Sequence, residues 1–294
     1  MRERPRAQWL TGERLHLSHG PIDLVLQAWG DEGEVRAAYA AARARFETIL
    51  EELVGELPAL RSPISDRPQV TGPTARRMVA AVLPFAGEFV TPMAAVAGAV
   101  ADEMMAAMRG KAELAKAFVN DGGDIAIHLA PGETMTLGVA GDFSRGPVPA
   151  LNGSLVLRAE DRIAGVATSG FTGRSLSFGI ADAVTVLAAD AAAADAAATL
   201  IANAVDVDSP AVERRPASAL DPDTDLGERP VTVRVGPLFQ DEIAAALASG
   251  RRQAETYCDR GLIRAAALML RGEIVVVGTS RPLALSHPER VSGH

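Results

Sequence analysis

Two oxygen-bearing side chains, Asp195 and Thr199, stand four residues apart in an alanine-rich segment of this chain. If the segment is a helix, this spacing places the carboxylate and the hydroxyl on one face, a single turn apart. Hard oxygen ligands suit Mg²⁺, which proteins usually bind through one or two carboxylates together with the phosphates of a ligand. The pair therefore predicts a magnesium site that serves a phosphate-bearing ligand. A solvent-exposed helix face shows the same spacing, so that interpretation stays open.

A polar loop follows the strand expected at 162–168. Thr168, Ser169 and Gly170 offer hydroxyls and unhindered amides, which suit a phosphate, a ribose or the edge of a flavin ring. Arg174 and Ser175 prolong this stretch, and the Arg174 guanidinium is suited to pairing with a pyrophosphate. The alternative is a Ser/Thr-rich loop without a ligand.

A third candidate is the paired glycine turn inside 117–129, where Gly122 and Gly123 precede Asp124. Paired glycines permit positive φ angles and let a ligand approach the backbone closely. An ordinary hairpin turn explains the same pattern. The carboxylate of Asp124, placed just before an apolar strand, favours a ligand site.

The remaining residues form no recognised catalytic motif. The five histidines are scattered, and neither a Walker loop nor an H-E-x-x-H motif is present. A single cysteine, Cys258, excludes an intrachain disulfide and a thiolate metal cluster. The methionines in 93–108 fall at helical spacing and indicate core packing. Asp102, in the same apolar segment, points either at the site or at solvent, and Asp182 is equally compatible with a structural and a functional role.

Composition restricts the partners. The chain has 294 residues, of which 48% are hydrophobic, and this is enough for a large core. A net charge of -8 without a Lys/Arg block argues against nucleic acid. The charged N-terminus is not a secretory signal, and no apolar run reaches the ~18–20 residues of a membrane span. We expect a cytoplasmic protein with no membrane partner. Alanine-rich helix faces also suit contacts between subunits, so a homo-oligomer stays open.

The elements that must position these residues indicate a single α+β domain over 1–294 with an antiparallel sheet, because strands come in hairpins and helices in blocks. No direct repeat is visible, although a diverged duplication stays open. The last dozen residues are expected to be loosely held. Helices are expected at 34–57, 74–83, 92–108, 190–205 and 239–257. Strands are expected at 15–29, 117–129 (two arms), 134–140, 154–158, 162–168, 183–189, 231–235 and 262–278 (a hairpin), with loop at 206–229.

Four segments, in this order, resemble motifs of the ApbE-like superfamily, whose best-known members are flavin transferases. They are T-P-M-A-A-V-A-G-A-V-A-D (91–102), V-N-D-G-G-D-I (119–125), A-T-S-G (167–170) and A-V-T-V-L-A with A-D-A-A-A-T (183–199). H-G-P-I-D-L (19–24) and G-R-S-L-S-F-G-I-A-D (173–182) resemble more closely an uncharacterised bacterial and archaeal branch of that superfamily. The motif-bearing core covers about 85–205.

The resemblance implies a tunnelling-type (T-fold-like) α+β fold, in which helices back the antiparallel sheet. It implies FAD in a cleft, and Mg²⁺ held by Asp195, Thr199 and a backbone carbonyl near Val96. It also implies a protein acceptor, because the transferases move FMN from FAD onto a threonine of a target protein. Chemically this is magnesium-assisted phosphoryl transfer.

Two departures from the family pattern leave the reaction open. The transferases carry a histidine-containing segment after the Thr-Ser-Gly loop, whereas residues 171–182 hold no histidine. The family's alanine-lysine-glycine is Val96-Ala97-Gly98 here, without the lysine. The catalytic base is therefore unknown. The alternatives are a non-catalytic protein that binds a flavin or nucleotide, and an enzyme that acts on an unrelated small metabolite.

Overall fold

The computed structural model describes residues 4–142, 150–173 and 175–278. Its main sheet has nine antiparallel strands in the order β1-β2-β3-β4-β5-β8-β9-β12-β13. The helices are α1 (Glu32–Gly55), α2 (Leu57–Leu60), α3 (Pro73–Val82), α4 (Val96–Arg109), α5 (Ala191–Ala204) and α6 (Gln240–Asp259). The strands are β1 (Arg6–Leu10), β2 (Arg14–His19), β3 (Ile22–Gly30), β4 (Leu114–Asp121), β5 (Asp124–Leu129), β6 (Thr134–Asp142), β7 (Ala150–Arg158), β8 (Gly165–Ser169), β9 (Ala183–Ala188), β10 (Val212–Pro216), β11 (Pro230–Val235), β12 (Ala265–Leu270) and β13 (Glu273–Gly278).

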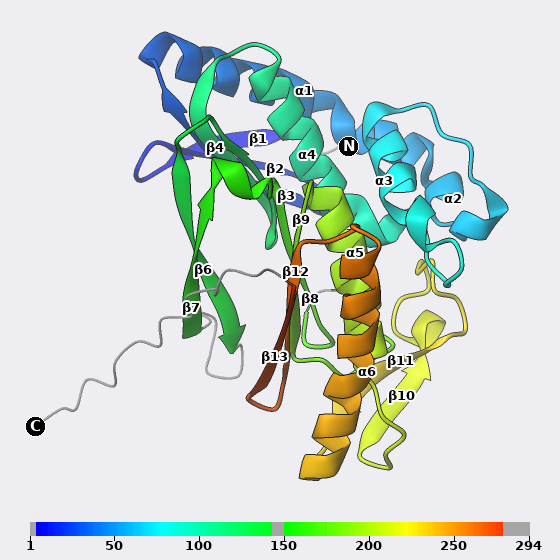
Figure 1. Ribbon diagram of the computed structural model, residues 1–294. Helices are drawn as coiled ribbons and strands as arrows, with labels where there is room; N and C mark the ends of the chain where they lie inside the picture. The colour runs from blue at the N-terminus through cyan, green and yellow to red at the C-terminus, as the bar shows by residue number, and fades with distance from the viewer. Residues whose placement is uncertain (1–3, 143–149, 174, 279–294) are drawn as a thin grey trace, which may run out of the picture.

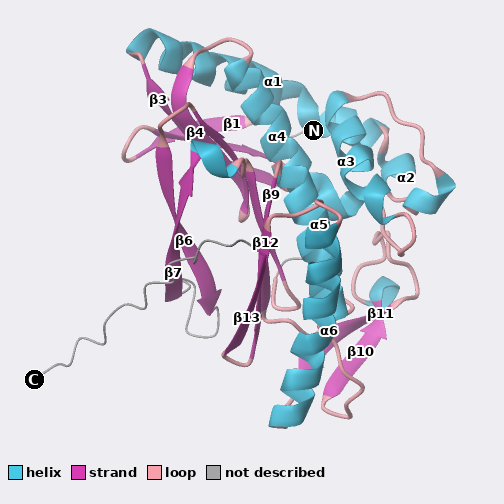
Figure 2. Ribbon diagram, in the orientation of Figure 1, coloured by secondary structure: helices cyan, strands magenta, loops and turns pink. Residues whose placement is uncertain are grey.

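The long helices cover one face of the sheet in chain order. Helix α1 packs on β2 and β3, α4 on β4 and β5, α5 on β8 and β9, and α6 on β12 and β13. The hairpin β6–β7 lies on the opposite side, away from the helices (Figures 1 and 2). This arrangement confirms the predicted α+β class with an antiparallel sheet backed by helices. None of the helices in the described part of the chain is long and apolar enough to cross a membrane.

The order of the main elements repeats. Strands β2 and β3, helices α1 and α4, and strands β4 and β5 form one ββααββ unit. Strands β8 and β9, helices α5 and α6, and strands β12 and β13 form a second unit in the same order. The two units meet where β5 pairs with β8 and where α4 packs against α5. The topology therefore contains a repeat, although the amino-acid sequence shows none.

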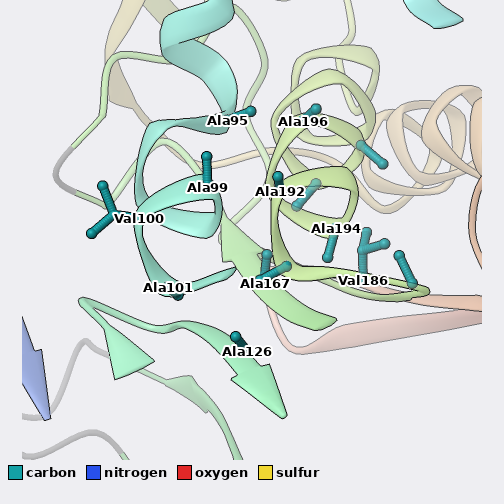
Figure 3. Close-up of a cluster of buried hydrophobic side chains, with 14 of the residues drawn as sticks. Ala95, Ala99, Val100, Ala101, Ala126, Ala167, Val186, Ala192, Ala194 and Ala196 are labelled. Carbon is teal, nitrogen blue, oxygen red and sulfur yellow. The ribbon is translucent and has the colours of Figure 1, made fainter. Parts of the chain in front are cut away.

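The core follows from the residue pattern. In β3 the buried positions alternate with more exposed ones, because successive side chains of a strand point to opposite faces. Nine of the 14 residues of α5 are alanine, and these short side chains let the helix lie close to both the sheet and α4. Figure 3 shows this packing, with Ala99 of α4 and Ala192 of α5 between the two helices and Ala167 of β8 beneath them. The methionines of α4, including Met104 and Met108, are buried as expected.

Three sequence expectations were wrong in detail. The strand expected at 15–29 is a hairpin, because Gly20 adopts a φ of 56° and turns the chain between β2 and β3. The edge strand β1 was not expected. The loop expected at 206–229 contains β10, which pairs with β11 in a separate two-stranded ribbon. The expectation for the last dozen residues concerns a part of the chain outside the described residues.

Candidate functional site

The paired glycines form the tight turn between β4 and β5. Gly122 and Gly123 have φ angles of 64° and 120°, which an L side chain rarely adopts. Asp121 and Asp124 face each other as the last paired residues of the hairpin. The turn is closed by Asn120, whose side-chain oxygen accepts a hydrogen bond from the Gly123 N–H at 2.8 Å. The glycines thus place two carboxylates side by side at one end of the sheet.

The sheet opens next to this turn. Strands β5 and β8 are in register only at Ile125 with Val166 and at Ala126 with Gly165. Beyond this pairing, the Thr168 N–H of β8 donates to Oδ1 of Asp124 at 3.2 Å. The side chain of Asp124, rather than a backbone carbonyl of β5, is therefore the acceptor at this position. The gap between the two strands exposes the end of β8 and the loop that follows it.

The N-terminal turns of α4 and α5 lie beside this opening. Oδ2 of Asp195, on α5, accepts a hydrogen bond from the Gly98 N–H of α4 at 3.0 Å. In the other direction, Asp102 of α4 accepts from the N–H groups of Ala191 and Ala192, at 3.1 and 2.9 Å. These donors belong to the first turns of their helices, where backbone N–H groups have no partner within the helix.

The carboxylates of the site repel one another. Burial raises the pKa of Asp195 well above its usual value, and the charges of Asp124 and Asp121 raise it further, while the Gly98 N–H opposes the shift. Burial also raises the pKa of Asp124 to about 7, against the Thr168 N–H and with a contribution from Asp121. The charges of Asp121 and Asp124, which flank the paired glycines, therefore act on Asp195 across the boundary between the two ββααββ units.

These elements border a cleft of about 900 Å³. The β4–β5 turn, the end of β8 with its following loop, the start of α4 and the β6–β7 hairpin all contribute to the wall. Polar lining residues are Asn120, Asp121, Asp124, Thr168, Ser169, Thr172, Ser175, Asp182 and Thr185. Apolar lining residues include Ile22, Met93, Val96, Val100, Ile125, Leu137, Leu155 and Val166. Among the lining residues that the structure describes, none is Lys, Arg or His.

The structure places most of the sequence candidates around this cleft. The residues that line it are Gly122, Gly123, Asp124, Thr168, Ser169, Gly170 and Ser175. Asp195 lies behind the wall, where its hydrogen-bond donor Gly98 follows the lining residue Ala97. Thr199 lies one turn farther along α5 and is partly buried, but it is not a lining residue. Arg174 lies outside the described residues.

The structure explains three of the residues that the sequence singled out. Gly170 is close-packed, because a Cβ there would lie 2.5 Å from the carbonyl oxygen of Asp182. Asp182 lines the cleft while its carboxylate accepts a hydrogen bond from the Arg271 N–H. Asp102 points neither at the cleft nor at solvent, since both of its oxygens cap α5.

Sequence reasoning missed Asp121 and Thr185. Asp121 stands beside the same glycine pair as Asp124, so the N-D-G-G-D pattern already contained its signal. Thr185 lies on β9, and its hydroxyl is 2.9 Å from that of Thr168 on the neighbouring strand. Its neighbours on β9 are apolar, so its type alone did not mark it.

The donor set is compatible with Mg²⁺ but not with a cage made of protein ligands alone. The described residues contain no group of three or more His, Cys, Asp or Glu side chains arranged to hold a metal ion. Mg²⁺ commonly takes one or two carboxylates and completes its shell with water and substrate phosphates. A cation beside Asp195 would relieve the repulsion among the carboxylates that raises their pKa values. The residues present therefore fit a magnesium ion that arrives with a phosphate-bearing ligand.

The cleft is also compatible with a nucleotide that carries a flat aromatic ring. Its volume lies within the ~300–1,000 Å³ usual for small-molecule sites, which combine apolar walls with a few polar groups. The hydroxyls and amides after β8 are suited to ribose or phosphate, and the aliphatic side chains of α4 and the β6–β7 hairpin are suited to a ring.

Fold and cleft together define an α+β protein whose candidate site lies at the junction of two ββααββ units. A family model described as AbpE bacteria matches residues 6–276, and the chain belongs to this family. This finding confirms the predicted place in an ApbE-like family.

The chain is similar in sequence to archaeal proteins. The UPF0280 protein of Methanopyrus kandleri is 34% identical over 216 residues, which cover 72% of this chain and 83% of the relative. The UPF0280 protein of Methanosarcina acetivorans is 34% identical over 193 residues, which cover 65% and 72%. Among solved structures, the ApbE protein of Thermotoga maritima aligns over 94% of this chain and 96% of its own, with a TM-score of 0.46 and 14% identity. The apo form of the flavinyl transferase ApbE of Pseudomonas stutzeri aligns with a TM-score of 0.41 and 12% identity, over 95% and 96%.

Proposed function

We propose that this chain binds a flavin dinucleotide, FAD, together with Mg²⁺ in the cleft between the β4–β5 turn and the start of α4. The observation that carries the proposal is the position of Asp195, held by the Gly98 N–H and set against Asp124 and Asp121. The charges of Asp124 and Asp121 raise the pKa of Asp195, so a cation beside Asp195 is electrostatically favoured. Membership of the ApbE-like family supports a flavin as the ligand.

The protein groups have separate tasks in this proposal. Asp195 and Thr199 hold the cation, with a backbone carbonyl near Val96. The Thr168-Ser169-Gly170 segment, Arg174 and Ser175 contact the phosphates and ribose. Gly122, Gly123 and Asp124 form the opposite wall. The cation supplies the positive charge that the described lining side chains lack.

The proposal predicts that FAD binding depends on the cation, because phosphate groups are repelled by carboxylates that nothing neutralises. The test is titration of the purified protein with FAD, followed by flavin fluorescence, with and without MgCl₂. Riboflavin, which lacks phosphate, is the control ligand, and its binding should not respond to Mg²⁺. Equal FAD affinity with and without Mg²⁺ contradicts the metal part of the proposal, and no FAD binding in either condition contradicts the ligand.

FMN transfer to a protein acceptor is the second candidate, which the family membership favours. The measurement is AMP release from FAD in the presence of Mg²⁺ and a threonine-containing acceptor peptide. Retention of FAD without AMP release points instead to a binding protein without transfer chemistry. The lack of a histidine among the described lining residues favours that outcome.

A further inference from the structure

Helices α4 and α5 cap each other. Gly98 N–H of α4 donates to Asp195 of α5, and the N–H groups of Ala191 and Ala192 of α5 donate to Asp102 of α4. Each carboxylate lies four residues after the first capped position on its own helix. The two helices therefore share one reciprocal cap, which consists of Gly98, Asp102, Ala191, Ala192 and Asp195.

The reciprocal cap joins backbone directly to backbone. A Cβ on Gly98 would lie 2.3 Å from the Ala191 carbonyl oxygen and 2.8 Å from the Ala192 Cα, so no side chain separates the helices at this point. Figure 3 shows the same close approach through the alanines between the two helices. Because contact is this tight, α5 cannot shift along α4 without losing the hydrogen bonds at both ends of the cap.

The hydrogen bonds that Asp102 accepts determine where Asp195 lies. Asp195 follows Ala191 by one helical turn, so the first turn of α5 carries the Asp195 side chain with it. Asp102 is the group from α4 that holds this turn, through both of its oxygens. Loss of Asp102 frees two N–H groups of α5 and lets its first turn move away from Gly98.

We propose that Asp102 is a positioning residue for the cation site, because it holds the first turn of α5 where Asp195 accepts the Gly98 N–H. This inference rests on the proposed function, in which Asp195 holds a divalent cation. Asp102 touches neither cation nor ligand, and it acts only through the first turn of α5.

Asp190 offers a matched control. Its side chain accepts a hydrogen bond from the Ala193 N–H at 2.7 Å, so it caps the same end of the same helix. It is exposed and caps its own helix rather than linking α5 to α4. Asp190→Ala therefore removes a cap of α5 and leaves the reciprocal cap in place.

The test measures Mn²⁺ affinity by electron paramagnetic resonance, together with the melting temperature, for the full-length wild type, D102A, D102N and D190A. Loss of a group that orients a metal ligand typically weakens metal binding about 10–100-fold. We expect a loss of at least about 10-fold for D102A, a smaller loss for D102N, which keeps one acceptor oxygen, and none for D190A despite a lower melting temperature.

Each outcome is decisive. If D102A and D190A bind Mn²⁺ equally well, Asp102 only stabilises the helix and the inference is wrong. If D102A does not fold, D102N decides, and unchanged Mn²⁺ affinity in that variant overturns the inference. If the wild type binds Mn²⁺ and the Asp102 variants bind it with the same affinity, the proposed function stands while the positioning role falls. A wild type that binds no Mn²⁺ overturns both.

Discussion

Asp102 and Asp195 are equivalent in local geometry and different in their surroundings. Each lies one turn after a capped N–H group of its own helix and accepts hydrogen bonds from the first turn of the other helix. The charged neighbours of Asp102 are Asp190 and Arg77, whereas Asp195 faces the paired carboxylates of Asp121 and Asp124. Burial and capping therefore do not by themselves distinguish the carboxylate proposed to hold a cation from the one proposed to position it. The distinction comes from other elements that bring further oxygens to the same place.

Of the substitutions that compare Asp195 with Asp102, Asp195→Asn is expected to have the largest effect on Mn²⁺ affinity. The amide oxygen can still accept the Gly98 N–H, so the reciprocal cap and the fold are kept. Removal of the ligand charge should lower Mn²⁺ affinity by more than the roughly 10–100-fold that loss of an orienting group costs. The same variant should lose Mg²⁺-dependent FAD binding.

The measurement compares D195N with D102N in the Mn²⁺ titration and in urea unfolding. We expect D195N to be the weaker binder and D102N the less stable protein, because Asp102 accepts two backbone N–H groups and an asparagine oxygen replaces only one acceptor. Equal Mn²⁺ affinities in the two variants contradict the assignment of different roles.

Gly98→Ala tests the reciprocal cap itself. The added methyl group would lie 2.3 Å from a backbone oxygen of α5, and the helices must separate to admit it. Overpacking of this kind costs about 1–3 kcal/mol of unfolding free energy. Cation affinity should fall as well, because the Gly98 N–H moves away from Asp195.

The control for this variant is Gly55→Ala, at the end of α1, where a Cβ meets no atom within 4 Å. There the substitution should be neutral or stabilise the protein by up to about 1 kcal/mol, because alanine is the better helix former. If G98A is as stable as G55A and keeps its cation affinity, the helices are not in the close contact described here.

The parts of the site that depend on residues close together in the chain could be predicted from the sequence. The hairpin around Gly122 and Gly123 and the helix that carries Asp195 and Thr199 follow from turn chemistry and helical spacing. The junction of α4 and α5 does not, because Asp102 and Ala191 are 89 residues apart and neither residue type announces the other. For the same reason Asp102 was expected to face either the site or solvent. The hairpin at Gly20 was missed although the buried positions change from odd numbers, such as Leu17, to even numbers, such as Ile22, across the turn.

A last difference between the two carboxylates should appear in the pH dependence of stability. Burial raises the pKa of Asp102 from its usual 3.8 to about 7, and the charge of Asp190 raises it, while the N–H groups of Ala191 and Ala192 and the charge of Arg77 lower it. The folded protein thus holds this proton more tightly than the unfolded chain. The stabilisation is complete below about pH 4 and is lost as the pH rises through about 7.

Asparagine at position 102 does not titrate, so the unfolding free energy of the wild type minus that of D102N should fall between pH 5 and pH 8, by an amount on the order of 1 kcal/mol. Asp195→Asn with and without Asp102→Asn is the control pair, because it removes the titration of Asp195 from both proteins. Urea unfolding at several pH values measures it. Because Asp102 is not a cation ligand, the fall should persist when Mg²⁺ is present. Parallel pH profiles for the two proteins would show that folding does not raise the pKa of Asp102. A difference that Mg²⁺ abolishes would place Asp102 in the cation site and remove the contrast with Asp195.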